Sequence, residues 1–121
     1  MSEAVKLSFT ARVTNEKGES FSVKVGGRNG WFLLVLMDRG KRGLSTIERQ
    51  GPRMSQYAML LRRKGINIAT HWESHGGSFG GEHGRYELLD TVKVEGGTLS
   101  QWLNSPEGRR EFPRQTFGVA A

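Results

Sequence analysis

Between residues 45 and 65 the sequence carries start and stop signals for two consecutive helices, which limits the possible folds more than any other feature. Ser45-Thr46-Ile47-Glu48 has the pattern of a capping box, in which the serine hydroxyl and the glutamate carboxylate each accept a hydrogen bond from the other residue's backbone N–H. A short helix is therefore predicted over residues 46–50. Gly51-Pro52 ends it, and proline suits the first position of a second helix because its missing N–H would have no helical partner there.

The second helix is predicted over residues 52–64, with Gly65 as its C-terminal glycine. Four residues of this segment recur at helical spacing, which places them on one buried stripe: Met54, Tyr57, Ala58 and Leu61. A short capped helix, a tight glycine-containing turn and a second helix together indicate a helix-turn-helix.

Two kinds of periodicity precede this unit. Residues 6–13 and 21–25 alternate apolar and polar side chains on either side of the turn Asn15-Glu16-Lys17-Gly18, which predicts an N-terminal β-hairpin. Residues 30–39 are apolar almost all round, which predicts a short buried helix with Asn29 as its N-cap.

Strand signals follow the second helix. Residues 66–72 alternate as a strand does, residues 75–84 form a glycine-rich loop, and residues 85–94 predict one or two short strands. A strand pair joined by a long loop directly after a helix-turn-helix is a wing, here assigned to residues 73–85.

The predicted fold class is therefore α+β, a winged helix-turn-helix preceded by an N-terminal β-hairpin. Residues 1–95 form this domain, and residues 96–121 form a C-terminal tail that is partly ordered or binds a partner.

Basic side chains are concentrated in the same part of the chain. The 121 residues carry a formal net charge of +6, and residues 39–64 hold eight basic side chains against the single acid Glu48. The whole basic excess lies in this stretch, whereas a charge that serves solubility would be spread out. Such clustering indicates a polyanion site, and double-stranded DNA is the predicted partner. A solvated helix face is the alternative.

The second helix of a helix-turn-helix presents its N-terminal residues to base edges in the major groove, and arginine and glutamine can bind guanine and adenine there. For the helix at 52–64 the candidate base-reading residues are Arg53, Ser55, Gln56 and Met59. The candidate phosphate contacts are Arg39, Lys41, Arg42, Arg49, Arg62 and Arg63. The candidate wing contacts are His75, His83 and Arg85. Any one of these cations could instead be an ordinary surface residue.

Four segments of the sequence together have a recognisable pattern: Gly43-Leu44-Ser45-Thr46-Ile47-Glu48, Gly51-Pro52-Arg53, Tyr57-x-x-x-Leu61-Arg62-x-x-Gly65-Ile66-x-Ile68-x-Thr70, and His83-Gly84-Arg85-Tyr86-x-Leu88. With these segments the sequence resembles the small bacterial and phage-borne winged helix-turn-helix domain family over roughly residues 6–94. The resemblance implies a DNA-binding protein, and we expect a sequence-specific transcriptional regulator. A homodimer is compatible with that function, although no heptad pattern marks a dimer helix.

Catalytic, metal and cofactor sites are not predicted. The chain has no cysteine, which excludes disulfides, thiol chemistry and zinc fingers built on thiolates. His71, His75 and His83 lie near two glutamates, but no rigid element spaces them as ligands, so polar wing residues are preferred to a metal site. The serines have no histidine and acid in a rigid arrangement, and an enzyme is not expected.

Membrane association is not expected either. The longest apolar run, Trp31–Met37, is far shorter than the roughly 20 residues that a spanning helix needs. The first residues also lack the layout of a signal peptide. A soluble, cytoplasmic protein is predicted.

The tail combines helix signals with aromatic residues. Residues 98–103 can form a helical turn, and Ser105-Pro106 can open another. Trp102, Phe112 and Phe117 either dock on the domain or bind a second protein. The second outcome corresponds to an alternative function, in which a phage or mobile-element protein uses the winged-helix scaffold to bind and modulate a host protein.

Overall fold

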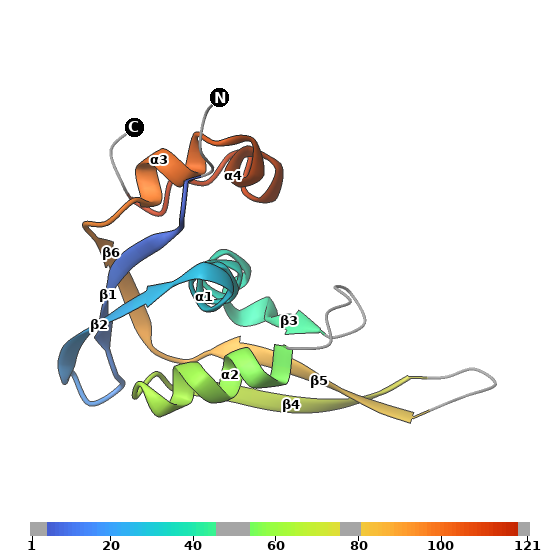
Figure 1. The fold of residues 1–121 in the computed structure, drawn as a ribbon. Helices are drawn as coiled ribbons and strands as arrows, with labels where there is room; N and C mark the ends of the chain where they lie inside the picture. Colours follow the sequence, from blue (N-terminus) through green and yellow to red (C-terminus); the bar gives the residue numbers. More distant parts are fainter. Residues whose placement is uncertain (1–4, 46–53, 76–80, 119–121) are drawn as a thin grey trace.

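The computed structural model describes residues 5–45, 54–75 and 81–118. Within these ranges the strands form two three-stranded antiparallel sheets, with the order β2-β1-β6 in one and β3-β5-β4 in the other (Figure 1). The elements are β1 (Ser8–Thr14), β2 (Ser20–Gly26), α1 (Gly27–Arg39), the short 3-10 helix η1 (Gly40–Arg42), β3 (Leu44–Ser45), α2 (Met54–Arg63), β4 (Ile68–His75), β5 (Gly81–Leu88), β6 (Thr91–Glu95), α3 (Leu99–Leu103) and α4 (Pro106–Glu111).

The predicted N-terminal hairpin is present as β1 and β2. Phe9, Ala11 and Val13 on β1 are each at most 1% exposed, because alternate residues of a strand point to one face and this face packs on the core. The hairpin has a third strand that the sequence did not predict as its partner. Residues Thr91–Glu95 pair with β1 as β6, so the chain returns from the wing to the N-terminal sheet.

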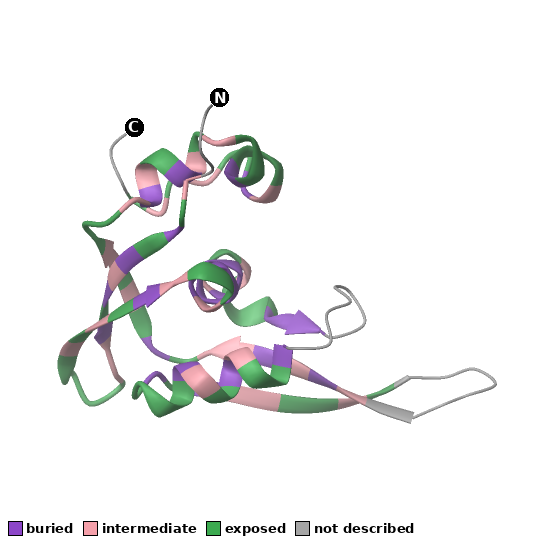
Figure 2. Cartoon of the chain, in the orientation of Figure 1, coloured by how far each residue is buried: buried purple, intermediate pink, exposed green. Residues whose placement is uncertain are grey.

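Helix α1 lies between the two sheets and contacts both of them and α2 (Figure 1). Every residue from Trp31 to Leu36 is buried, which confirms the predicted buried helix (Figure 2). The predicted N-cap Asn29 is wrong, because the helix begins at Gly27 and its N-cap is Gly26, without a side-chain hydrogen bond. Glycine is needed there because a Cβ at Gly26 would come within 2.8 Å of the carbonyl oxygen of Leu7.

Helix α2 confirms the second predicted helix. Met54, Ala58 and Leu61 are buried and Tyr57 is half-buried, with its ring 5.9 Å from that of Phe32 on α1. Gly65 has a φ of +97°, and its N–H donates to the carbonyl of Arg62 at 2.9 Å, as a C-terminal glycine does.

The first predicted helix of the motif lies outside the described residues. So do Glu48 of the capping box and the site candidates Arg49 and Arg53. Ser45 is described, is 1% exposed and belongs to β3, a short strand that pairs with β5 and that the sequence did not predict.

The wing is a longer ribbon than expected. Strands β4 and β5 pair from Ile68 opposite Leu88 to His75 opposite Gly81. The predicted loop boundaries are therefore wrong at both ends, since His75 lies in β4 and residues 81–84 lie in β5. Gly84 lies within the paired strands, opposite Trp72, and a Cβ there would meet the Thr70 methyl group at 3.3 Å.

The tail forms α3 and α4, and Ser105 caps α4 by accepting a hydrogen bond from Gly108 N at 3.2 Å. Thr98 joins the tail to the N-terminal sheet, where its N–H donates to Ser8 O at 2.7 Å and its Oγ1 accepts from Ser8 N at 3.1 Å. Trp102 and Phe112 are 2% and 6% exposed, and Phe117 packs on Phe112 with ring centroids 5.1 Å apart.

Of the two outcomes considered for these aromatic residues, the structure shows docking on the chain itself. The predicted role of Trp102 and Phe112 as anchors for a second protein is therefore wrong, because their surfaces are already covered.

Candidate nucleic-acid interface

The outer surface of α2 carries most of the predicted base-reading residues. Ser55, Gln56 and Met59 are exposed, and they lie on the helix opposite the stripe that packs on the core (Figure 2). The physical cause is the helical period, because burying Met54, Ala58 and Leu61 turns the intervening positions outward. Arg63 and Lys64 are exposed at the C-terminal end of the same helix.

Arg62 has a second task in the fold. Its Nε and Nη2 both donate to the carbonyl of Ile68, at 3.0 and 2.7 Å, and Nη2 also donates to Thr70 Oγ1 at 2.7 Å. This guanidinium thus ties the end of α2 to the start of β4 and sets the position of the wing relative to the helix. The sequence predicted a phosphate contact here and did not predict these bonds.

Three further predicted phosphate contacts, Arg39, Lys41 and Arg42, lie in or directly before η1. Arg39 donates through Nε to the carbonyl of Gly43 at 2.7 Å, which closes the turn after α1. Lys41 and Arg42 are exposed on η1, and the Arg42 carbonyl accepts a hydrogen bond from Arg85 Nη1 at 3.0 Å.

Two of the three predicted wing contacts, His83 and Arg85, are held by a carboxylate of the wing itself. Glu73 Oε1 accepts from Arg85 Nε at 2.9 Å and lies 3.1 Å from His83 Nε2. On the same face His71 Nε2 lies 2.8 Å from Glu87 Oε1. His83 and Arg85 are thus engaged with Glu73, while the side chain of His75 lies outside what the structure describes. Basic and acidic side chains therefore alternate on this face of the wing.

Trp72 is a candidate contact that the sequence analysis missed. Its side chain is 70% exposed, on the same face of β4 as Ile68 and Thr70. This is the face toward α2, since Arg62 reaches the Thr70 hydroxyl. The alternation of residues 66–72 predicted that Trp72 shares a face with Ile68 and Thr70. Nothing in the sequence indicates that β4 has already extended beyond the core at residue 72.

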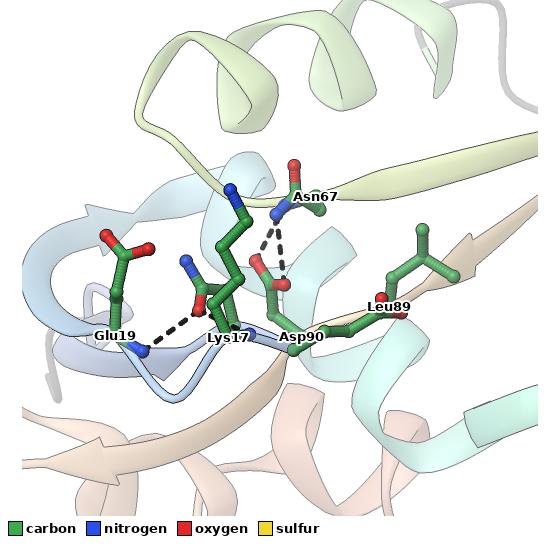
Figure 3. Close-up of a pocket in the computed structure, with 7 residues that line it drawn as sticks. Lys17, Glu19, Asn67, Leu89 and Asp90 are labelled. Atoms are coloured by element: carbon green, nitrogen blue, oxygen red, sulfur yellow. Dashed lines mark hydrogen bonds between the residues drawn. The ribbon is translucent and has the colours of Figure 1, made fainter.

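A buried carboxylate connects the residue before β4 to the turn after β5 (Figure 3). Asp90 is 6% exposed, and it accepts hydrogen bonds from the backbone N–H of Asn67 at 2.8 Å and from Asn67 Nδ2 at 3.1 Å. The Leu89 N–H also donates to the Asn67 carbonyl at 3.0 Å. The turn after α2 is thereby fastened to the turn that leaves β5.

We expect Asp90→Ala to lower the free energy of unfolding by about 1.5–3 kcal/mol, because it removes the buried, charged acceptor of two hydrogen bonds from Asn67. Urea denaturation followed by far-ultraviolet circular dichroism measures the loss. Glu95→Ala is the control, since it removes an exposed carboxylate from the next strand. Equal stabilities of the two variants would contradict this role for Asp90.

Among residues 5–45, 54–75 and 81–118 no three histidine or acidic side chains are grouped as ligands of one metal ion. The helices in these ranges also include none with the length and hydropathy to cross a bilayer.

Comparison with known families gives one result. A family model described as a winged helix domain matches residues 22–98 of the chain. The matched segment runs from β2 through α1, α2 and the wing to the residue before α3. No curated protein and no solved structure matches the chain.

Proposed function

The chain belongs to the winged helix domain family, a fold typical of DNA-binding proteins, and from this premise we propose that it is a sequence-specific double-stranded DNA-binding protein that regulates transcription. The observation that carries the proposal is the outward surface of α2. A buried stripe holds the helix on α1, and polar and apolar side chains suited to base edges face away from the core.

The residues of this surface would make different kinds of contact with DNA, according to their chemistry. Gln56 can bind an adenine through both groups of its amide, Ser55 can bind either kind of base edge, and Met59 can contact a thymine methyl group. Arg63 and Lys64 would contact phosphates, which position the helix without reading sequence. Trp72 would add an apolar contact beside the helix, on the face of the wing that α2 shares.

Fluorescence anisotropy of labelled duplexes tests the proposal. Wild-type protein is expected to bind random duplex DNA with an affinity that falls steeply with salt, and to bind one selected sequence more tightly. No binding of any duplex at low salt would overturn the proposal.

Gln56→Ala is expected to cost about 1–3 kcal/mol on the selected sequence and to relax preference at one base pair, because one bidentate contact is lost. Gln101→Ala on α3 is the matched control, since Gln101 is also an exposed helical glutamine. A Gln56→Ala variant with unchanged preference at every position would show that Gln56 does not read a base.

A further inference from the structure

The β2-β1-β6 sheet has an outer face, which is a different surface from the exposed side of α2. One face packs on the core through Phe9, Ala11 and Val13, and the alternate residues point the other way. The outward residues are all polar and are half-buried or exposed: Ser8, Thr10, Arg12, Thr14, Ser20, Ser22, Lys24, Thr91, Lys93 and Glu95. Six carry hydroxyl groups, three carry positive charge and one carries negative charge.

The cations on this face lie close together. Arg12 on β1 is directly opposite Lys93 on β6, and Lys24 on β2 is opposite Thr10, which makes it a diagonal neighbour of Arg12. Like charges directly opposite in an antiparallel pair destabilise a sheet. Glu95 is the other neighbour of Thr10, yet in the described part of the chain Arg12, Lys24 and Lys93 make no ion pair or side-chain hydrogen bond.

We propose that this face binds the phosphodiester backbone of DNA, as a second surface in addition to α2. Phosphate oxygens would supply the negative charge that the opposed Arg12 and Lys93 lack. The neighbouring serine and threonine hydroxyls are of the kind that donate to phosphates in protein–DNA complexes. This inference rests on the proposed DNA binding and adds a contact that the helix-turn-helix does not provide.

An acidic protein is the other polyanionic partner, and the composition of the face argues against it. Stable protein interfaces are anchored by buried aromatic and aliphatic side chains at their centre. The apolar residues of these strands point into the core instead, and the centre of the outer face is a row of hydroxyl groups and cations. Such a surface can hold a charged backbone but gives an apolar anchor no place to bury.

The test compares two double variants that remove the same charge, Arg12→Gln with Lys93→Gln and Arg109→Gln with Arg110→Gln. The second pair is exposed on α4, outside the sheet face. Both are measured against random duplex DNA between about 50 and 200 mM salt. We expect only the sheet variant to reduce the salt slope, by about 1.8, as the loss of two phosphate contacts requires.

Chemical protection gives a second measurement. Lys24 and Lys93 in the wild-type protein are expected to be protected from acetylation by bound duplex, whereas the exposed turn residue Lys17 is not. The inference is overturned if wild-type protein binds duplex while the sheet variant keeps its salt slope and Lys24 and Lys93 stay reactive. It is also overturned if polyglutamate protects these lysines as well as DNA does. Absence of duplex binding by the wild-type protein would instead overturn the proposed function.

Discussion

Trp102→Ala is expected to lower the free energy of unfolding by about 3–5 kcal/mol, because it empties a large buried site in the small core. The indole is 2% exposed and its ring centroid lies 6.0 Å from that of Phe112, so both helices of the tail lose packing. The residues around the indole cannot easily move in to fill the empty space. Gly108 already lies so close to the backbone of Trp102 that a Cβ on Gly108 would collide with the Trp102 carbonyl oxygen. Urea denaturation followed by circular dichroism measures the change.

Trp72→Ala is the matched control, because it removes the same side chain from a site that is 70% exposed. We expect its stability to change by no more than about 0.5 kcal/mol, as for most surface substitutions. Under the proposed function Trp72→Ala weakens duplex binding without loss of stability. A Trp102→Ala variant as stable as the wild type would contradict the packing of the tail on the N-terminal sheet.

Replacing Arg63 and Lys64 together with glutamate is expected to weaken binding of all duplex sequences by about a hundredfold at roughly 0.1 M salt. Each lost phosphate contact makes the slope of log affinity against log salt shallower by roughly 0.9, and the new carboxylates repel the phosphates. The salt slope falls while the preference for one sequence over another is kept, because phosphate contacts carry no sequence information. Anisotropy titrations on random and selected duplexes give both quantities.

Arg109→Glu with Arg110→Glu is the control for charge and for the helix end, since these arginines also lie in the last turn of a helix. Glutamate at that position costs each helix about 0.3–1 kcal/mol through the helix dipole, so thermal unfolding is compared for both variants. Equal loss of affinity in the two variants would show that total charge, and not the surface of α2, governs binding.

Arg62 is unsuitable for the same test although it belongs to the same basic run. Its substitution would remove a positive charge and also the hydrogen bonds to Ile68 and Thr70, which position the wing. A loss of binding would then have two causes, whereas Arg63 and Lys64 separate them.

Local patterns predicted the elements that form the site. The i, i+3, i+4, i+7 stripe of α2 and the alternation of β1 are properties of neighbouring residues, and the structure confirms both. The same stripe placed Ser55, Gln56 and Met59 on the outer surface, because a helix that buries one side must expose the other.

Charge predictions were less complete, because a sequence does not show which opposite charge lies nearby. Arg85 and His83 were expected to face a partner, but β4 and β5 pair in a register that brings both to Glu73. The cationic row of Arg12, Lys24 and Lys93 was missed for the related reason that β6, which carries Lys93, is distant in sequence from the hairpin of β1 and β2.

By itself the sequence determined the order of the N-terminal hairpin, α1, α2 and the wing strands, the buried sides of β1, α1 and α2, and the winged-helix class, since each depends on side-chain periodicity and turn residues over a few positions. Only the tertiary structure decided that β6 joins β1, that Thr98 fastens the tail to Ser8, and that Trp102 is buried while Trp72 is exposed. These outcomes depend on contacts between residues as many as 90 positions apart. Such contacts follow from how strands pair and which surfaces they cover, and local propensity carries no record of either.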